Sequence, residues 1–281
     1  GQDALNACMQ AYGGFEHNLQ SLRVVDSLEL RYPQFAGLNL TYETREGILK
    51  HCSRSNAELL EAQEPGGVAS RFLLRQQPSL EAQLANLADE IAYNAHDIDD
   101  GVRSGLITQE QLAEVPLFAR YRSEALDEFP GLDAPATERR LLYEAIRRML
   151  SAQVYDVIEA TSAALASAAP RSVADVRLAA TLVCFSAPMR AQSSELKRFL
   201  FKNLYRHPQV VETTGRAQRV VTELFAAYVA EPREMKPRFT RQALEGEPSA
   251  RARAVADFIA GMTDRFAGRE HERLTGLRLL G

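Results

Sequence analysis

Apolar side chains recur every three to four residues over long parts of the chain, and alternating β-branched runs are almost absent. Leu, Ala, Glu, Arg and Gln, which favour helices, dominate these stretches. We therefore predict an all-α fold. The helices expected from the pattern cover about residues 3–12, 15–25, 41–51, 79–100, 137–168, 173–186, 195–205, 208–230 and 250–267.

Glycine and proline mark where these helices are expected to end. Gly13-Gly14 and Gly101 each follow a helical stretch, and a glycine commonly terminates a helix. Residues 53–77, which contain Pro65-Gly66-Gly67, are predicted to form a loop, and 232–248 an irregular connector. The chain has no internal repeat or low-complexity tract. We predict one domain over 1–281, with core helices over about 1–165 and a C-terminal helical extension over about 166–281.

The predicted helix 79–100 has faces of different chemistry when it is wound at 3.6 residues per turn. Small side chains line one flank and would let another helix approach closely, so we expect neighbouring helices to surround this helix. The apolar stripe consists of Leu80, Leu84, Leu87, Ile91 and Ile98, and the small flank of Ala85, Ala88, Ala92 and Ala95.

Polar side chains gather on the opposite face of the same helix. They are Asn86, Asp89, Tyr93, His96, Asp97 and Asp100. A mixed polar stripe of this kind is also typical of a face that simply meets solvent. This stripe contains no Lys or Arg, however, and clustered carboxylates repel one another unless a cation or hydrogen-bond donors lie among them. A metal site or a cationic pocket is therefore the second interpretation of this face, beside a face that simply meets solvent.

The bulk properties describe a globular chain of 281 residues without a dominant charge. Its 33 Lys+Arg and 37 Asp+Glu give a net charge of -4, so no global basic field indicates a nucleic-acid partner. Cys8, Cys52 and Cys184 have no paired spacing that would indicate disulfides or a cysteine zinc site. No apolar run approaches the length of a membrane span. These properties favour a cytoplasmic protein.

Several motifs, in order along the chain, resemble the bacterial deoxyguanosinetriphosphate triphosphohydrolase-like (dGTPase-like) family of HD-domain phosphohydrolases. The resemblance covers nearly the whole chain and implies an HD-type multi-helix bundle with additional C-terminal helices. The matching segments are Ala4–Asn6, Gly13–Asn18, Gln20–Arg23, Leu38–Thr41, Gly47–His51, Pro78–Gln83, Asn86–Gly101 and Ile259–Arg265.

The resemblance implies one metal ligand in this chain, Asp89. The adjacent His96-Asp97 is not the family's His-Asp pair, and neighbours on a helix point about 100° apart, so they do not easily share an ion. Gly1–Asn6 resembles the sequence that follows a phosphate-site His. We therefore expect the other ligands to precede Gly1, in an N-terminal segment that this chain lacks. The expected cofactor is a divalent metal, Mg²⁺ or Mn²⁺, and another transition metal is an alternative.

Two residues near the start of the chain are catalytic candidates by the same resemblance. His17 matches a His that can protonate the leaving nucleoside oxygen, and Gln2 stands where relatives usually have an acid that orients this His. An amide can orient an imidazole but cannot accept its proton. The alternative for His17 is a structural role, as a His at a helix start bonded to backbone near Gly14.

Five further residues are substrate-binding candidates. Tyr93 and Asp97 match the pair that packs on the sugar and reads its 3′-hydroxyl; an aromatic ring against C2′ would leave little room for a ribose hydroxyl. Lys50, Arg147 and Tyr155 match triphosphate and sugar contacts, and a triphosphate requires several cationic groups. Arg147 is also explained as a solvated arginine. We assign His51 and His207 structural roles.

The resemblance implies metal-dependent hydrolysis of a deoxynucleoside triphosphate to deoxynucleoside and inorganic triphosphate. One alternative is a non-catalytic module that senses nucleotide or binds single-stranded nucleic acid. Another is an HD phosphohydrolase that acts on nucleoside monophosphates or cyclic nucleotides. Relatives assemble as oligomers, so we expect a homo-oligomer. The sequence leaves base preference, metal identity and regulation by a second nucleotide open.

Overall fold

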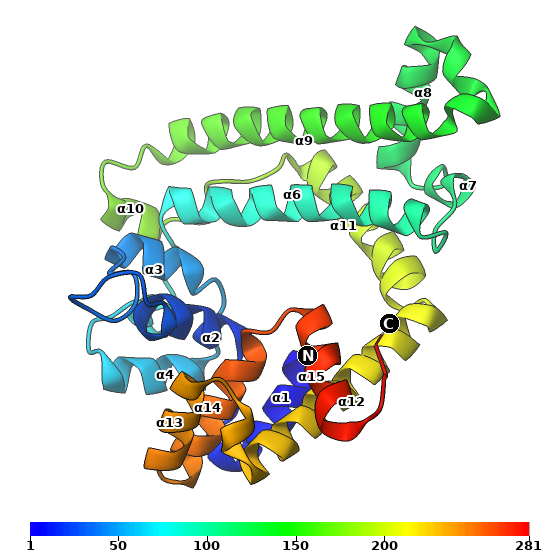
Figure 1. Ribbon diagram of the computed structural model, residues 1–281. Helices are drawn as coiled ribbons and strands as arrows, with labels where there is room; N and C mark the ends of the chain where they lie inside the picture. Colours follow the sequence, from blue (N-terminus) through cyan, green and yellow to red (C-terminus); the bar gives the residue numbers. More distant parts are fainter. Residues whose placement is uncertain (281) are drawn as a thin grey trace. The chain divides into compact units, whose positions relative to one another are not determined.

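The fold is helical throughout the part of the chain that the structure, a computed structural model, describes, which is residues 1–280 (Figure 1). Apart from one isolated bridge between Leu30 and Gly37, these residues contain no β-pairing. The prediction of an all-α fold is confirmed. The chain divides into two compact units, one of residues 42–207 and one of residues 1–41 together with the segment from 208 onward.

The unit of residues 42–207 is built around two long helices, α6 (Leu80–Arg103) and α9 (Glu138–Ala168). Helix α6 begins at Ser79, whose hydroxyl accepts a hydrogen bond from the Ala82 amide and so caps the helix. The other helices of this unit are α3 (Tyr42–Ile48), α4 (Arg54–Gln63), α5 (Ser70–Leu73), α7 (Gln109–Leu112), α8 (Pro116–Glu128), α10 (Val173–Leu178) and α11 (Ala187–Leu200), which continues as a π-helical turn, Phe201–Tyr205.

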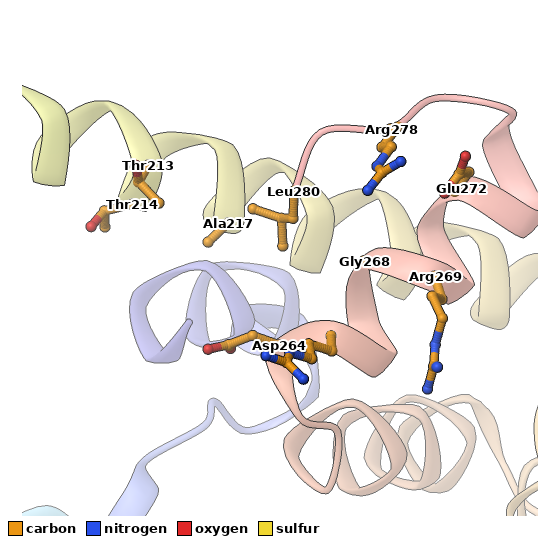
Figure 2. A pocket seen from close by; sticks show the side chains of 10 residues that line it. Thr213, Thr214, Ala217, Asp264, Gly268, Arg269, Glu272, Arg278 and Leu280 are labelled. Carbon is orange, nitrogen blue, oxygen red and sulfur yellow. The ribbon is translucent and has the colours of Figure 1, made fainter.

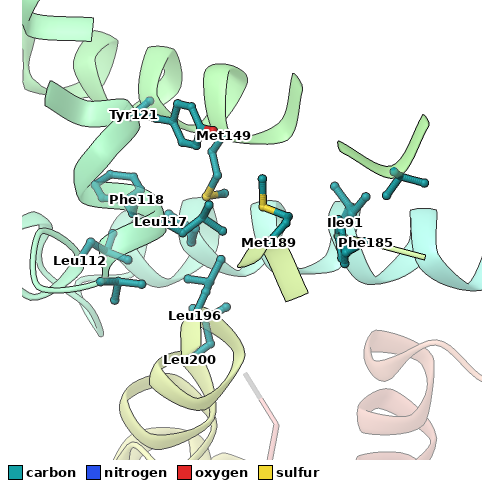
Figure 3. Packing of buried hydrophobic residues seen from close by; sticks show 14 of the residues in the cluster. Ile91, Leu112, Leu117, Phe118, Tyr121, Met149, Phe185, Met189, Leu196 and Leu200 are labelled. Atoms are coloured by element: carbon teal, nitrogen blue, oxygen red, sulfur yellow. The ribbon is translucent and has the colours of Figure 1, made fainter. Parts of the chain in front are cut away.

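The core of this unit lies where α6, α8, α9 and α11 meet (Figure 3). Phe118 and Met149 are fully buried between α8 and α9, and Leu196 is buried on α11. On α6, Leu87, Ile91 and Ile98 face this core because they recur at helical spacing on one side. The core thereby fixes which face of α6 points away from it, and that face carries Asp89, Tyr93 and the other polar candidates.

The second unit packs short N-terminal helices against the C-terminal ones. Its buried centre includes Met9, Leu224 and Val255, and a carboxylate, Asp257, is buried beside them. Arg23 donates to both oxygens of Asp257 at 2.7–2.9 Å, so the buried charge is paired. The helices of this unit are α1 (Gln2–Met9), α2 (His17–Arg23), α12 (Pro208–Ala230), α13 (Pro237–Glu245), α14 (Pro248–Ala260) and α15 (Asp264–Thr275).

Two regions expected to be irregular contain helices instead. Residues 53–77 form α4 and α5, because Ser53 caps α4 and the Pro65-Gly66-Gly67 turn occupies only the space between the two helices. Residues 232–248 contain α13, which starts at Pro237, a residue well suited to the first turn of a helix. The two predictions of irregular structure were therefore wrong.

Several predicted helix boundaries were also wrong. Helix α6 continues through Gly101 to Arg103, and this glycine is buried: a Cβ there would lie 2.8 Å from Ile107 Cδ1, so glycine serves close packing and not termination. The stretch 250–267 is two helices, since Thr263 caps α15 after a break at Gly261. Helix α11 starts at Ala187, capped by Ser186, and not near 195.

The prediction of a helix over 173–186 holds only as far as Leu178. Beyond it the chain is irregular, and the Gln83 side-chain oxygen accepts hydrogen bonds from the amides of the buried Leu182 and Val183 in place of helical partners.

The expected surroundings of α6 are only partly found. Leu84 is 51% exposed although it was assigned to the apolar stripe. Ala85, Ala88 and Ala92 are exposed as well, and of the small flank only Ala95 is buried. Within residues 1–280 the packing of α6 is concentrated on the side of Leu87, Ile91 and Ile98, so the prediction of a closely approached alanine flank was wrong at three of its four positions.

Candidate functional site

The first part of the candidate site is an ion pair between Asp89 and Lys50. Asp89 lies in the middle of α6 and Lys50 follows α3, and the Lys50 Nζ donates to Asp89 Oδ2 at 2.9 Å. The side chains are 65% and 36% exposed, so water reaches both charges. An exposed pair of this kind contributes about 0–1 kcal/mol to stability, and a ligand can displace it at small cost.

A cavity of about 340 Å³ adjoins this ion pair. Lys50, His51 and Asn86 line it on one side, and Arg190 on α11 lines it together with Glu90. Arg190 donates to Glu90 at 3.0 Å. The cavity volume is at the lower end of the range for small-molecule sites, and its lining offers amide, imidazole and cationic donors.

A buried charge cluster supports the chain on which Lys50 lies. Glu46, which is fully buried, accepts hydrogen bonds from Arg177, and the Nε of Arg71 lies 3.6 Å from the same carboxylate. Arg71 also donates to the Leu49 carbonyl at 3.0 Å. Burial lowers the pKa of Arg71, and the neighbouring Glu46 carboxylate opposes that shift. The cluster therefore fixes the backbone immediately before Lys50.

The second part of the candidate site lies one to two turns further along α6. Tyr205, in the π-helical turn after α11, donates its hydroxyl hydrogen to Asp97 Oδ2 at 2.5 Å. Its ring lies parallel to that of Tyr93, with centroids 6.5 Å apart and an interplanar angle of 3°. Tyr93 itself is 56% exposed. The contact therefore leaves Asp97 Oδ1 and much of the Tyr93 ring available to a ligand.

The environment of Asp97 shifts the pKa of its carboxyl group. Partial burial raises the pKa of Asp97 above its ordinary value, and the hydrogen bond from Tyr205 opposes this shift. Burial, followed by the bond to Asp97, raises the pKa of Tyr205, so its hydroxyl stays protonated and remains the donor. The pair consists of a carboxylate acceptor and a neutral phenol, a combination that holds a carboxylate in one orientation.

The two candidates on α9 are not joined to these groups. Arg147 is 65% exposed and donates to Glu144 on its own helix, at 2.6 and 3.0 Å. Tyr155 is 66% exposed. Among residues 1–280, no hydrogen bond or ring contact connects either side chain with Asp97 or Lys50. Their substrate roles stay predictions.

The catalytic candidates Gln2 and His17 belong to the other unit. Gln2 is the first residue of α1 and is exposed, whereas His17 opens α2 with a side chain that is 62% exposed. The Nδ1 of His17 lies 2.8 Å from Oε1 of Glu16. Glu16 also caps α2, because its Oε2 accepts the Leu19 amide. The acidic neighbour of this imidazole is therefore the preceding residue and not position 2.

Within residues 1–280, no three His, Cys, Asp or Glu side chains lie in an arrangement that could hold a metal ion. Asp89 is a single carboxylate, and a lysine ammonium already neutralises it. A divalent ion needs several oxygen or nitrogen donors at once. Among the described residues, Asp89 therefore lacks the further carboxylates, imidazoles or thiolates that would have to share an ion with it.

Three residues that contact the candidates were missed by the sequence analysis. Tyr205 is 108 residues from its partner Asp97, and an aromatic residue in an amphipathic helix is usually a packing residue. Glu16, in the other unit beside His17, lay inside a helix predicted for residues 15–25, so nothing marked it as the partner of the imidazole. Arg71 lay in a region predicted to be a loop. The π-helical turn at 201–205 would have been a useful signal, since such turns occur often at functional sites, but only the structure reveals it.

Residues 183–273 match the phosphohydrolase-associated domain family, which fits the all-helical fold. A deoxyguanosinetriphosphate triphosphohydrolase-like protein of Ralstonia nicotianae is 56% identical over 280 residues, which are 100% of this chain and 69% of that protein. A protein of the same name from Bordetella pertussis is 56% identical, over 98% of this chain and 69% of that protein. Another from Nitrosomonas europaea is 48% identical, over 98% of this chain and 70% of that protein. The chain belongs to the deoxyguanosinetriphosphate triphosphohydrolase-like family.

None of the helices within residues 1–280 combines the length and the apolar character needed to cross a lipid bilayer.

Proposed function

We propose that the protein hydrolyses deoxynucleoside triphosphates to deoxynucleoside and inorganic triphosphate. The name of the relatives, deoxyguanosinetriphosphate triphosphohydrolase-like protein, supports the proposal. In this reaction water attacks the α-phosphorus and the bond from that phosphorus to the 5′-oxygen breaks, so the 5′-oxygen must receive a proton.

The observation that carries the proposal is the contact of Tyr205 with both Tyr93 and Asp97. A deoxyribose has one flat apolar side and a 3′-hydroxyl. The exposed part of the Tyr93 ring fits the former, and the free Oδ1 of Asp97 can accept a hydrogen bond from the latter. Tyr205 keeps the ring and the carboxylate in place before the sugar arrives, which reduces the entropy lost on binding.

The phosphate end of the substrate is proposed to lie toward Lys50 and its adjoining cavity. Lys50 contacts Asp89, which precedes Tyr93 by about one turn of α6 and Asp97 by about two. Arriving phosphate oxygens would compete with Asp89 for the lysine, because they carry more charge than one carboxylate. The buried Arg71 cluster would keep the backbone at Lys50 fixed during this exchange.

His17 is proposed to supply the proton to the leaving 5′-oxygen. Its Nδ1 faces Glu16, so Nε2 is the nitrogen free to deliver a proton. The Glu16 carboxylate can orient the imidazole and can thus take the role expected of an acid at position 2. On this view Gln2 does not abolish the proton relay.

We propose further that activity requires a divalent metal, Mg²⁺ or Mn²⁺, to which this chain contributes Asp89. The remaining donors would come from residues outside 1–281; the relatives are longer than this chain, which spans 69% of the Ralstonia nicotianae protein. A bound metal would neutralise phosphate charge and lower the pKa of a water molecule.

Product analysis of the protein at its full natural length tests this function. Incubation with dGTP and Mn²⁺ or Mg²⁺, followed by ion chromatography, should release triphosphate and deoxyguanosine in equal amounts. Asp97→Ala should greatly reduce the release, whereas Asp100→Ala, on the same face of α6, should leave it nearly unchanged. Release of monophosphate or pyrophosphate, or tight dGTP binding without turnover, would contradict the proposal.

A further inference from the structure

A second cavity lies within the unit that contains the C-terminal helices, between α12, α15 and the residues after α15 (Figure 2). Its volume is about 760 Å³, well inside the range of small-molecule sites. Thr213 and Ala217 come from α12, and Arg278 and Leu280 come from the segment after α15. None of its lining residues takes part in the proposed hydrolysis.

The arginines of this cavity differ from the other arginines of the same two helices. Outside the cavity, Arg216 and Arg219 on α12 and Arg273 on α15 each form an ion pair with a glutamate at 2.5–2.9 Å. The lining arginines, by contrast, form no ion pair or side-chain hydrogen bond with any of residues 1–280. They are Arg265, Arg269 and Arg278.

Two carboxylates, Asp264 and Glu272, also line the cavity, but neither lies within ion-pair distance of a described cation. Arg265 and Arg278 therefore line one concave place together with two carboxylates, and their guanidinium groups donate to none of the described residues. Planar guanidinium groups recognise phosphate oxygens through paired hydrogen bonds, so the available donors match a phosphate-bearing ligand.

The tail that completes the cavity is held in position. His271, fully buried on α15, donates from Nδ1 to the Leu277 carbonyl at 3.0 Å, which fixes the chain next to Arg278. Gly268 allows Leu280 to lie close, since a Cβ at this glycine would be 3.4 Å from the Leu280 Cβ. Leu280 and Ala217 thus form an apolar part of the wall, and the hydroxyl of Thr213 adds a polar donor.

We propose that this cavity binds an oligophosphate anion, supplied either as free inorganic triphosphate or as the phosphate chain of a nucleotide. The proposal stands on the cavity and its unpaired arginines and does not depend on the hydrolysis proposed above.

Binding of inorganic triphosphate to the protein tests the proposal, measured by isothermal titration calorimetry in a Lys50→Ala background that weakens the other phosphate site. The double variant Arg265→Ala/Arg278→Ala should raise the Kd at least tenfold. The matched control Arg216→Ala/Arg219→Ala removes the same charge from α12 outside the cavity and should change the Kd less than twofold. All four side chains are exposed, so the fold should tolerate both variants.

Hydrogen exchange locates the binding and distinguishes the sources of the phosphate. With triphosphate bound, segments 208–217 and 264–280 should exchange more slowly. If dGTP in EDTA gives the same protection and triphosphate alone does not, the ligand is the phosphate chain of a nucleotide; if both do, phosphate alone suffices. Absence of binding at millimolar triphosphate and dGTP, equal affinity in the double variant, or protection confined to residues 42–207 would overturn the proposal.

Discussion

Two carboxylates in the unit of residues 42–207 are both paired with cations, yet they are built for different tasks. Glu46 is fully buried and lies between Arg71 and Arg177, whereas Asp89 is 65% exposed and has only Lys50 as its partner. A buried charge that loses its partners is costly, and an exposed one is not. The difference separates a carboxylate that holds the fold from one that can exchange its partner for a ligand.

The largest expected effect follows from breaking the buried cluster. Glu46→Ala leaves two guanidinium groups without their carboxylate, and we expect a loss of about 3–5 kcal/mol in the free energy of unfolding. Urea denaturation followed by circular dichroism measures it. The exposed pair of Glu58 with Arg54 gives the control, because Glu58→Ala should cost less than about 0.5 kcal/mol. A small loss for Glu46→Ala would show that the cluster is not structural.

Asp97 lies between these extremes, half-buried and bonded to Tyr205. Asp97→Ala should lower kcat/KM for dGTP about a hundredfold, roughly 2.7 kcal/mol, because the sugar loses an acceptor and Tyr205 loses its partner. The control Asp100→Ala lies on the same helix face and removes an exposed carboxylate that pairs with Arg103 and raises the pKa of Asp97, while leaving the Tyr205 contact in place. Steady-state kinetics measures kcat/KM for dGTP in both variants, and an equal loss in the two would refute a specific role for Asp97.

Lys50 is expected to act on substrate binding more than on stability. Lys50→Ala should raise KM for dGTP about tenfold, since one charge-assisted contact to phosphate is lost. Its unfolding free energy should change by less than about 1 kcal/mol, as the pair with Asp89 is exposed. Arg103→Ala removes an exposed cation from α6 and serves as the control. A Lys50→Ala variant with unchanged KM would place the phosphates elsewhere.

The smallest expected effect is a change in the pH profile. Burial raises the pKa of Asp97 and the Tyr205 hydrogen bond lowers it, so Tyr205→Phe should raise that pKa further. The carboxylate is the form that accepts the 3′-hydroxyl. Activity is therefore lost as pH falls through this pKa, and the acidic limb of kcat/KM should move to higher pH. The control Tyr143→Phe removes the hydroxyl of an exposed tyrosine on α9 and should leave the acidic limb of kcat/KM in place. A shift of the limb to lower pH would contradict this account.

The sequence predicted the parts of the molecule that depend on local periodicity. The long helix that contains Asp89, Tyr93 and Asp97 follows from apolar spacing, and the face that they share follows from the helical period. Contacts between distant segments were beyond such reasoning. Tyr205 reaches Asp97 across 108 residues, and Lys50 reaches Asp89 across 39. Local signals also failed where packing decided the outcome, as at Gly101, which continues the helix because Ile107 occupies the space of a side chain.

The most direct test of the central claim, that this face of α6 reads a deoxyribose, compares dGTP with 2′,3′-dideoxy-GTP as substrates for the protein at its full natural length. The ratio of their kcat/KM values isolates the 3′-hydroxyl. We predict that the wild-type protein prefers dGTP at least tenfold and that Asp97→Ala reduces this ratio to near one. An unchanged ratio in Asp97→Ala, with the fold intact, would contradict the account.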